Sequence, residues 1–179
     1  VAVTPSYRYR GVCMEGAISE KNVLDMITFL PRVGMNTYFI QFFRPTAFFF
    51  NWRTNPVCPE YDKGPQTPEE LDAIHEHIVR EMQRRGLDHQ AIGHGWTCKA
   101  LDLPTNNSVN NDFTYLELTE EQLAAFAMIN GERKMFRKAP LFTQVCMSNP
   151  ALRTRIAEAV ADYAQMHQNM AFLRVSLAD

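Results

Sequence analysis

The sequence has no long hydrophobic run, no excess of basic residues and no block of like charges. No apolar stretch reaches the roughly 18 residues that a membrane-spanning helix needs, so we do not expect a membrane protein. Lys and Arg number 18 against 20 Asp and Glu, and a net charge of −2 gives no reason to expect a nucleic-acid partner. The opening VAVTPSYRYR lacks the charged-then-apolar order of a signal peptide, which favours a cytoplasmic location.

Motifs that would bind a metal or a nucleotide are also missing. The cysteines are Cys13, Cys58, Cys98 and Cys146, and no two of them form a CxxC pair, which disfavours a zinc knuckle or a thioredoxin-type site. We expect reduced thiols, with a disulfide left open if the compartment is oxidising. No glycine-rich phosphate-binding motif follows a predicted strand, so neither a metal nor an organic cofactor is expected.

What the chain does contain is an alternation of strand-like and helix-like segments. Helices are predicted after the N-cap residues Ser19, Thr67, Thr119 and Asn149, and the second of these is a strong start, with Thr-Pro-Glu-Glu. Strands are predicted over 7–14, 35–43, 87–92, 141–147 and 170–179. The segment 141–147, LFTQVCM, is also compatible with a short strand inside a loop. Long loops are predicted over 44–66 and over much of 97–139.

This order predicts an α/β fold with a parallel sheet. We expect one domain over residues 1–179, of the (β/α)8 TIM-barrel type. Such a barrel usually needs about 250 residues. We therefore expect only the N-terminal part of the barrel, as a fragment of a longer protein. The open edge of an incomplete barrel is expected to promote self-association.

Chemically useful side chains follow the predicted strands. Barrel enzymes place their functional residues at the carboxyl ends of the strands, and the residues at or near these ends are Glu15, Gln41, His94, Trp96 and Asp179. In the stretch HQAIGHGW, two glycines leave space beside His94, and Trp96 offers an apolar face of the kind that stacks on a sugar ring. The alternative is a hydrogen-bonded core histidine whose glycines only form a turn.

Four segments together carry a resemblance to a known family: RYRGVCMEGA, VGMNTYFIQF, AIGHGWTC and CMSNPALR with the final VSLAD. The chain resembles a bacterial family of unknown function that carries a glycoside-hydrolase-like TIM barrel. It is more distantly similar to the β-N-acetylhexosaminidases and α-glucuronidases. The resemblance covers nearly the whole chain, with the segments in the family's order, and it implies a carbohydrate ligand.

The resemblance to the hexosaminidases also suggests particular residues. Their first strand opens with an Arg-Gly pair, as Arg10-Gly11 does here, and their third ends with a Gly-His pair, as Gly93-His94 does. A later strand closes with Asp-Glu, and Asp179 stands at the place of that Asp. The Glu that serves as general acid in those enzymes would come after Asp179, where this sequence ends. The catalytic acid therefore does not carry over.

The predicted function is hydrolysis of an O-glycosidic bond by two carboxyl groups. Glu15 and Asp179 are the candidates, with Glu15 alternatively paired to Arg10. The predicted substrate-binding residues are Arg10, Gln41, Arg44, His94 and Trp96, and Arg44 is equally compatible with a solvated loop position. The alternatives are a divalent-metal-dependent barrel isomerase or epimerase, for which Glu15, His94 and Asp179 are acceptable ligands, and a non-catalytic carbohydrate-binding barrel.

Two other clusters are interpreted as structural. The aromatic segment 47–53, AFFFNWR, is expected to be core beneath a loop, with a sugar-stacking wall as the alternative. His75 and His77 resemble a metal pair, but residues two apart on a helix do not share a face. Both are therefore expected to be surface histidines.

Overall fold

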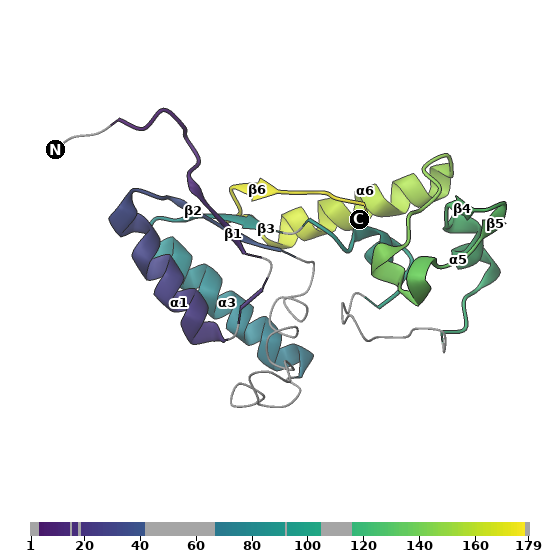
Figure 1. Ribbon diagram of the computed structural model, residues 1–179, viewed down its shortest axis with the longest axis horizontal. Helices are drawn as coiled ribbons and strands as arrows, with labels where there is room; N and C mark the ends of the chain where they lie inside the picture. Colours follow the sequence, from purple (N-terminus) through teal and green to yellow (C-terminus); the bar gives the residue numbers. More distant parts are fainter. Residues whose placement is uncertain are drawn as a thin grey trace.

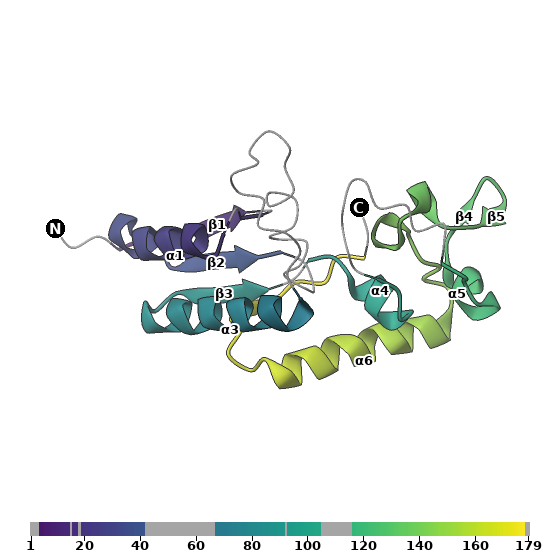
Figure 2. The ribbon, with the colours of Figure 1, turned by 90° about the horizontal axis from the view of Figure 1, so that it is seen from below.

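The computed structural model describes residues 4–14, 16–17, 19–41, 67–91, 93–104 and 116–177. Its centre is a four-stranded parallel sheet in the order β1-β2-β3-β6. The strands are β1 (Gly11–Met14), β2 (Thr37–Ile40), β3 (Asp88–Ala91) and β6 (Phe172–Leu173). In Figure 2 the arrows of β1, β2 and β3 point the same way. The predicted parallel α/β class is confirmed, and the sheet is open within the described residues.

Four helices begin where the sequence predicted, after Ser19, Thr67, Thr119 and Asn149, and one further α-helix of the described ranges was not predicted. They are α1 (Glu20–Phe29), α3 (Pro68–Arg84), α4 (Trp96–Ala100), α5 (Glu120–Ala125) and α6 (Pro150–Met166). Ser19, Thr67, Thr119 and Asn149 each accept a hydrogen bond from a backbone N–H of the first turn, as N-cap residues do. Helix α4 was not predicted because its N-cap residue, Gly95, has no side chain that could cap the helix. None of the helices in the described ranges is long and apolar enough to cross a membrane.

Helices α1 and α3 lie side by side on one face of the sheet (Figure 1). Between them and the sheet is a core of buried apolar side chains from α1, β2 and α3, including Val23, Ile27, Tyr38, Ile78 and Met82. The apolar spacing that predicted each helix is what forms this core, since residues three and four apart share one helix face.

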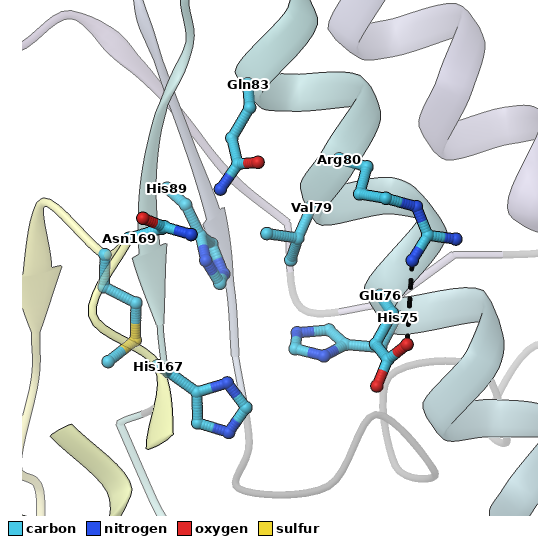
Figure 3. Close-up of a pocket in the computed structure, with 9 residues that line it drawn as sticks. His75, Glu76, Val79, Arg80, Gln83, His89, His167 and Asn169 are labelled. Atoms are coloured by element: carbon cyan, nitrogen blue, oxygen red, sulfur yellow. Dashed lines mark ion pairs between the residues drawn. The ribbon is translucent and has the colours of Figure 1, made fainter. Parts of the chain in front are cut away.

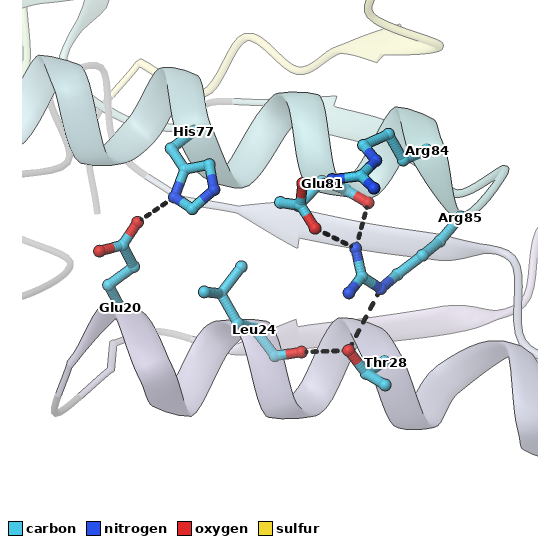
Figure 4. A network of polar contacts seen from close by, with 7 residues as sticks. All are labelled: Glu20, Leu24, Thr28, His77, Glu81, Arg84 and Arg85. Atoms are coloured by element: carbon cyan, nitrogen blue, oxygen red, sulfur yellow. Dashed lines mark hydrogen bonds and ion pairs between the residues drawn. The ribbon is translucent and has the colours of Figure 1, made fainter.

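Polar contacts join the same two helices at both ends (Figure 4). Glu20 on α1 lies 2.5 Å from Nδ1 of His77 on α3. At the other end, Arg85 donates to Thr28 at 3.1 Å and forms an ion pair with Glu81 at 2.6 Å. Hydrogen bonds from Arg85 and Arg84 lower the pKa of Glu81. Half-exposed His77 is thus a helix-pairing residue.

The long excursion after β3 forms a second core beyond the carboxyl ends of the strands (Figure 2). It contains α4, α5, the hairpin of β4 (Met128–Ile129) and β5 (Glu132–Arg133), and the 3-10 helices η3 (Phe136–Lys138) and η4 (Pro140–Phe142). Helix α6 starts in this region and runs back along the sheet. A further 3-10 helix, η1 (Leu30–Val33), follows α1.

The predicted strand over 141–147 is wrong. Its first half belongs to η4, and its second half contributes one isolated bridge, between Val145 and Phe126. Buried Thr143 explains the difference. Its hydroxyl donates to Ala139 O at 2.8 Å and accepts from Phe136 N at 3.0 Å, and these local bonds replace a strand ladder.

Candidate functional site

The segments that follow β2, β3 and β6 meet at the carboxyl edge of the sheet. A methyl group built on Gly93 would lie 3.7 Å from Phe39 Cζ, 3.8 Å from Ser176 Oγ and 3.9 Å from Gln41 Cγ. Pairing beyond β6 holds Ser176 in place, because Ser176 N donates to Gly93 O at 2.5 Å. We call Gln41, Gly93, His94 and Ser176 the carboxyl-edge site. The structure thus places the predicted Gln41 beside Gly93, the residue before the predicted His94, and adds Ser176, which the sequence did not single out.

The two glycines beside His94 have different roles. Gly95 has a φ of 108°, in the left-handed region, and begins α4 as its N-cap. A side chain there would be strained, so this glycine serves the turn. Gly93 has no such φ, and a methyl group on it would lie at ordinary van der Waals distance from its neighbours. Without a side chain, Gly93 adds no bulk beside half-buried His94. Gly95 therefore forms a turn, as the structural interpretation predicted, and a role for Gly93 in admitting a ligand stays a prediction.

The expectation that Trp96 stacks on a sugar is wrong for this structure. Its side chain is 0% exposed and belongs to the second core. The indole Nε1 donates to Arg174 O at 3.1 Å, and the ring meets Tyr163 edge-on at 5.8 Å between centroids. Trp96 anchors α4 to the chain after β6 and has no face left for a ligand.

Arg10 lies at the opposite edge of the sheet from the carboxyl-edge site, just before β1. Its guanidinium donates to the backbone carbonyls of Gly34 at 2.8 Å and Tyr7 at 2.5 Å. The backbone N–H of Arg10 donates to Asn36 Oδ1 at 2.9 Å. Arg10 therefore joins the N-terminal segment to the turn before β2, and the structure does not bring it together with Gln41 and His94.

Several predicted residues lie outside the described part of the chain. These are the two candidate catalytic carboxyl groups, one candidate substrate-binding residue and an aromatic segment: Glu15, Asp179, Arg44 and 47–53. By sequence, Glu15 directly follows the last residue of β1, and Asp179 comes two residues after Leu177. Their predicted roles stay predictions.

The face of the sheet opposite α1 and α3 carries a hollow of about 280 Å³. Arg174 crosses its floor, donating to Gln90 at 2.9 Å and lying 5.3 Å over the ring of Phe39. Cys13 and Thr37 also line it. Sequence reasoning missed Gln90 and Arg174, although the period-2 alternation of strand residues places Gln90 on the face away from the helices.

The metal alternative requires a cluster of ligating side chains, and the cysteines in the described ranges are thiols. Among the described residues, no three His, Cys, Asp or Glu side chains form a group that could hold a metal ion. Cys98 is a buried thiol, and its burial raises its pKa to about 12. Cys146 is also a thiol, and a hydrogen bond from Arg133 lowers its pKa.

A second candidate site lies between α3 and the turn that joins α6 to β6. Figure 3 shows the rings of His75, His89 and His167 around one hollow of about 180 Å³. We call this the histidine groove. His89 lies at its base with only 4% of its surface exposed, and half-buried His75 lies 5.7 Å from it between ring centroids. The prediction of a surface position is therefore wrong for His75.

Burial keeps the groove histidines uncharged at neutral pH. Burial, with a smaller repulsion from His167, lowers the pKa of His75 to about 4, although Asp72 and Glu76 oppose the shift. Burial followed by repulsion from His75 and His167 lowers the pKa of His89 to about 3. Burial also lowers the pKa of His167. The ordinary value for histidine in an unfolded chain is about 6.5.

Acid is expected to destabilise the fold through these histidines. Because their folded pKa values lie below the unfolded value, the unfolded chain binds more protons as the pH falls from 6.5 toward 4. The contribution of these neutral histidines to the free energy of unfolding is fully present above pH 6.5. The part due to His75, on the order of 3 kcal/mol, is lost as the pH falls toward 4. Urea unfolding at several pH values measures this loss in the free energy of unfolding.

His75→Gln removes the titrating ring and should reduce the pH slope. Gln83→Ala, on the same helix and without a titratable group, is the control and should keep it. An equal slope in wild type and His75→Gln would show that His75 does not contribute.

No protein-family model matches the chain, and no curated protein matches it. The class that the structure defines is a parallel α/β fold with polar side chains gathered at the carboxyl edge of its sheet.

Proposed function

We propose that this chain is part of a TIM-barrel glycoside hydrolase whose substrate binds at the carboxyl edge of the sheet. The observation that supports it is the convergence of Gln41, Gly93 and Ser176, which follow the ends of three parallel strands, with His94 directly after Gly93. Parallel α/β proteins bind their ligands at this edge, since the loops that follow the strands meet there.

The barrel itself is part of the proposal. Parallel strands with helices on one face are the unit of a (β/α)8 barrel, and the hollow lined by Gln90 and Arg174 would then face the barrel interior. In that arrangement Gln41, His94 and Ser176 offer hydrogen-bond donors and acceptors to sugar hydroxyl groups. Glu15 and Asp179 are the proposed carboxyl groups for hydrolysis, on the basis of their positions after strand segments in the sequence.

Calorimetric titration with a panel of monosaccharides and uronic acids tests the binding step. We expect saturable binding that His94→Ala and Gln41→Ala each weaken by about tenfold, or 1.4 kcal/mol. His77→Ala is the matched control, since His77 contacts Glu20 between helices α1 and α3. Sugar affinity that is unchanged by His94→Ala and Gln41→Ala, or no binding to any sugar, would contradict the proposed site.

Hydrolysis is a separate step with its own test. Chromogenic glycosides should be cleaved by the protein, and Glu15→Gln or Asp179→Asn should abolish turnover while leaving sugar binding within a few-fold. Binding without any turnover would replace the hydrolase with a carbohydrate-binding protein. Turnover that requires an added divalent ion would replace it with the metal-dependent alternative.

A further inference from the structure

The histidine groove lies on the helix-covered side of the sheet, apart from the carboxyl-edge site. Its walls come from α3 and from the turn after α6, and its base is β3 (Figure 3). The residues that line it are His75, Glu76, Val79, Arg80, Gln83, His89, His167, Asn169 and Met170. Nothing in the proposed glycosidic chemistry uses these residues.

The base of the groove holds a polar atom with an unmet hydrogen bond. Nε2 of His89 is buried and has no hydrogen-bond partner among the residues that the structure describes. A buried nitrogen left in this state costs about 1–3 kcal/mol, because it has lost water without gaining a replacement. A molecule that enters the groove and supplies a hydroxyl group to Nε2 would recover that cost.

The charge of the lining limits what kind of molecule fits. His75 and His89 are neutral at pH 7, and Gln83 and Asn169 are uncharged amides. The remaining charges at the mouth belong to Glu76 and Arg80, which lie 3.6 Å apart and offset each other. An ionic ligand would lose its hydration without meeting an opposite net charge, so the lining disfavours it.

The same lining suits hydroxyl groups. A neutral imidazole has one N–H donor and one acceptor nitrogen, and a side-chain amide has both functions, which matches a hydroxyl group that donates and accepts at once. Val79 and Met170 provide apolar surface for C–H groups. The volume of about 180 Å³ is smaller than the 300 Å³ or more of a drug-sized pocket, so the ligand is small.

We propose that the histidine groove binds a small, uncharged polyhydroxylated molecule, with one of its hydroxyl groups on Nε2 of His89. The proposal stands apart from the hydrolase: it concerns other residues on another side of the sheet, and either one can fail without the other. Sequence reasoning missed it because His75, His89 and His167 are brought together only by the packing of α3 and α6 around β3.

Titration with myo-inositol and with glucose, followed by NMR of the histidine ring nitrogens, tests the proposal. We expect saturable shifts of His89 below about 100 mM ligand, the concentration at which binding is worth only about 1.4 kcal/mol. His89→Phe removes the nitrogen in a ring-shaped side chain, and binding to it, followed through the ring nitrogens of His75 and His167, should be at least tenfold weaker. Gln83→Ala is the second variant, for use if His89→Phe does not fold. Because Gln83 is exposed, this change leaves the core intact, and it should weaken binding several-fold.

Controls separate this groove from the other site. His77→Gln, on the far side of α3, and His94→Ala, at the carboxyl edge, should both leave the His89 shifts unchanged. The proposal is overturned if no His89 shift saturates up to that concentration, or if sulfate, acetate or Zn²⁺ binds more tightly than either polyol. It is also overturned if Gln83→Ala and folded His89→Phe bind as wild type does.

Discussion

Replacing Trp96 with alanine is expected to lower the free energy of unfolding by about 3–5 kcal/mol. The indole is fully buried among residues of α4, α5 and α6, so its removal leaves a large cavity in the second core. The substitution also leaves Arg174 O without the indole N–H that now lies 3.1 Å away. Since this bond ties α4 to the chain after β6, the carboxyl-edge site should loosen as well.

Urea unfolding followed by far-ultraviolet circular dichroism measures this loss without relying on the removed fluorophore. Trp96→Phe is the matched variant: it keeps an aromatic ring but not the N–H, and should cost less than the alanine change. An unchanged midpoint in Trp96→Ala would mean that the indole is exposed in solution. That outcome would restore it as a candidate surface for sugar stacking.

Replacing Gly11 with alanine is expected to cost at least about 3 kcal/mol, or to prevent folding. A methyl group on Gly11 would lie 2.0 Å from Thr37 O and 2.7 Å from Thr37 Cβ. The nearest atom is backbone in the neighbouring strand, so the clash can be relieved only by moving β1 away from β2. That movement would break the parallel pairing that begins with Gly11 opposite Thr37.

Gly93→Ala is the control for this steric argument. Its added methyl would meet nothing closer than 3.7 Å, so we expect a stability change within about 0.5 kcal/mol. Thermal unfolding of both variants gives the comparison, and amide hydrogen exchange in β1 and β2 reports on the pairing itself. Equal stability of Gly11→Ala and wild type would mean that β1 does not pair as closely as described.

Local signals in the sequence predicted most of the regular structure. Capping residues and helical apolar spacing placed α1, α3, α5 and α6 within a residue or two of their starts, because a cap depends on contacts three residues away. The hairpin of β4 and β5 also had a local signal that was overlooked. Asn130 and Gly131 both adopt positive φ, as a tight Asn-Gly turn requires.

Burial was the property that local signals could not supply. Trp96 and His75 were expected to be exposed, yet one is a core residue and the other lines a groove. In each case a packing partner comes from more than sixty residues later in the chain: Tyr163 of α6 for Trp96, and His167, directly after α6, for His75. The same reasoning explains Arg10, whose partners at Gly34 and Asn36 follow an intervening helix.

By itself, the sequence determined the alternation of strands and helices, their parallel arrangement and the gathering of Gln41 and His94 near strand ends, since these depend on short-range periodicity and on the direction of the chain. Only the tertiary structure decided which residues are covered. It buried Trp96, moved Arg10 to the opposite edge and assembled three histidines from distant segments, because burial depends on which distant surfaces pack together.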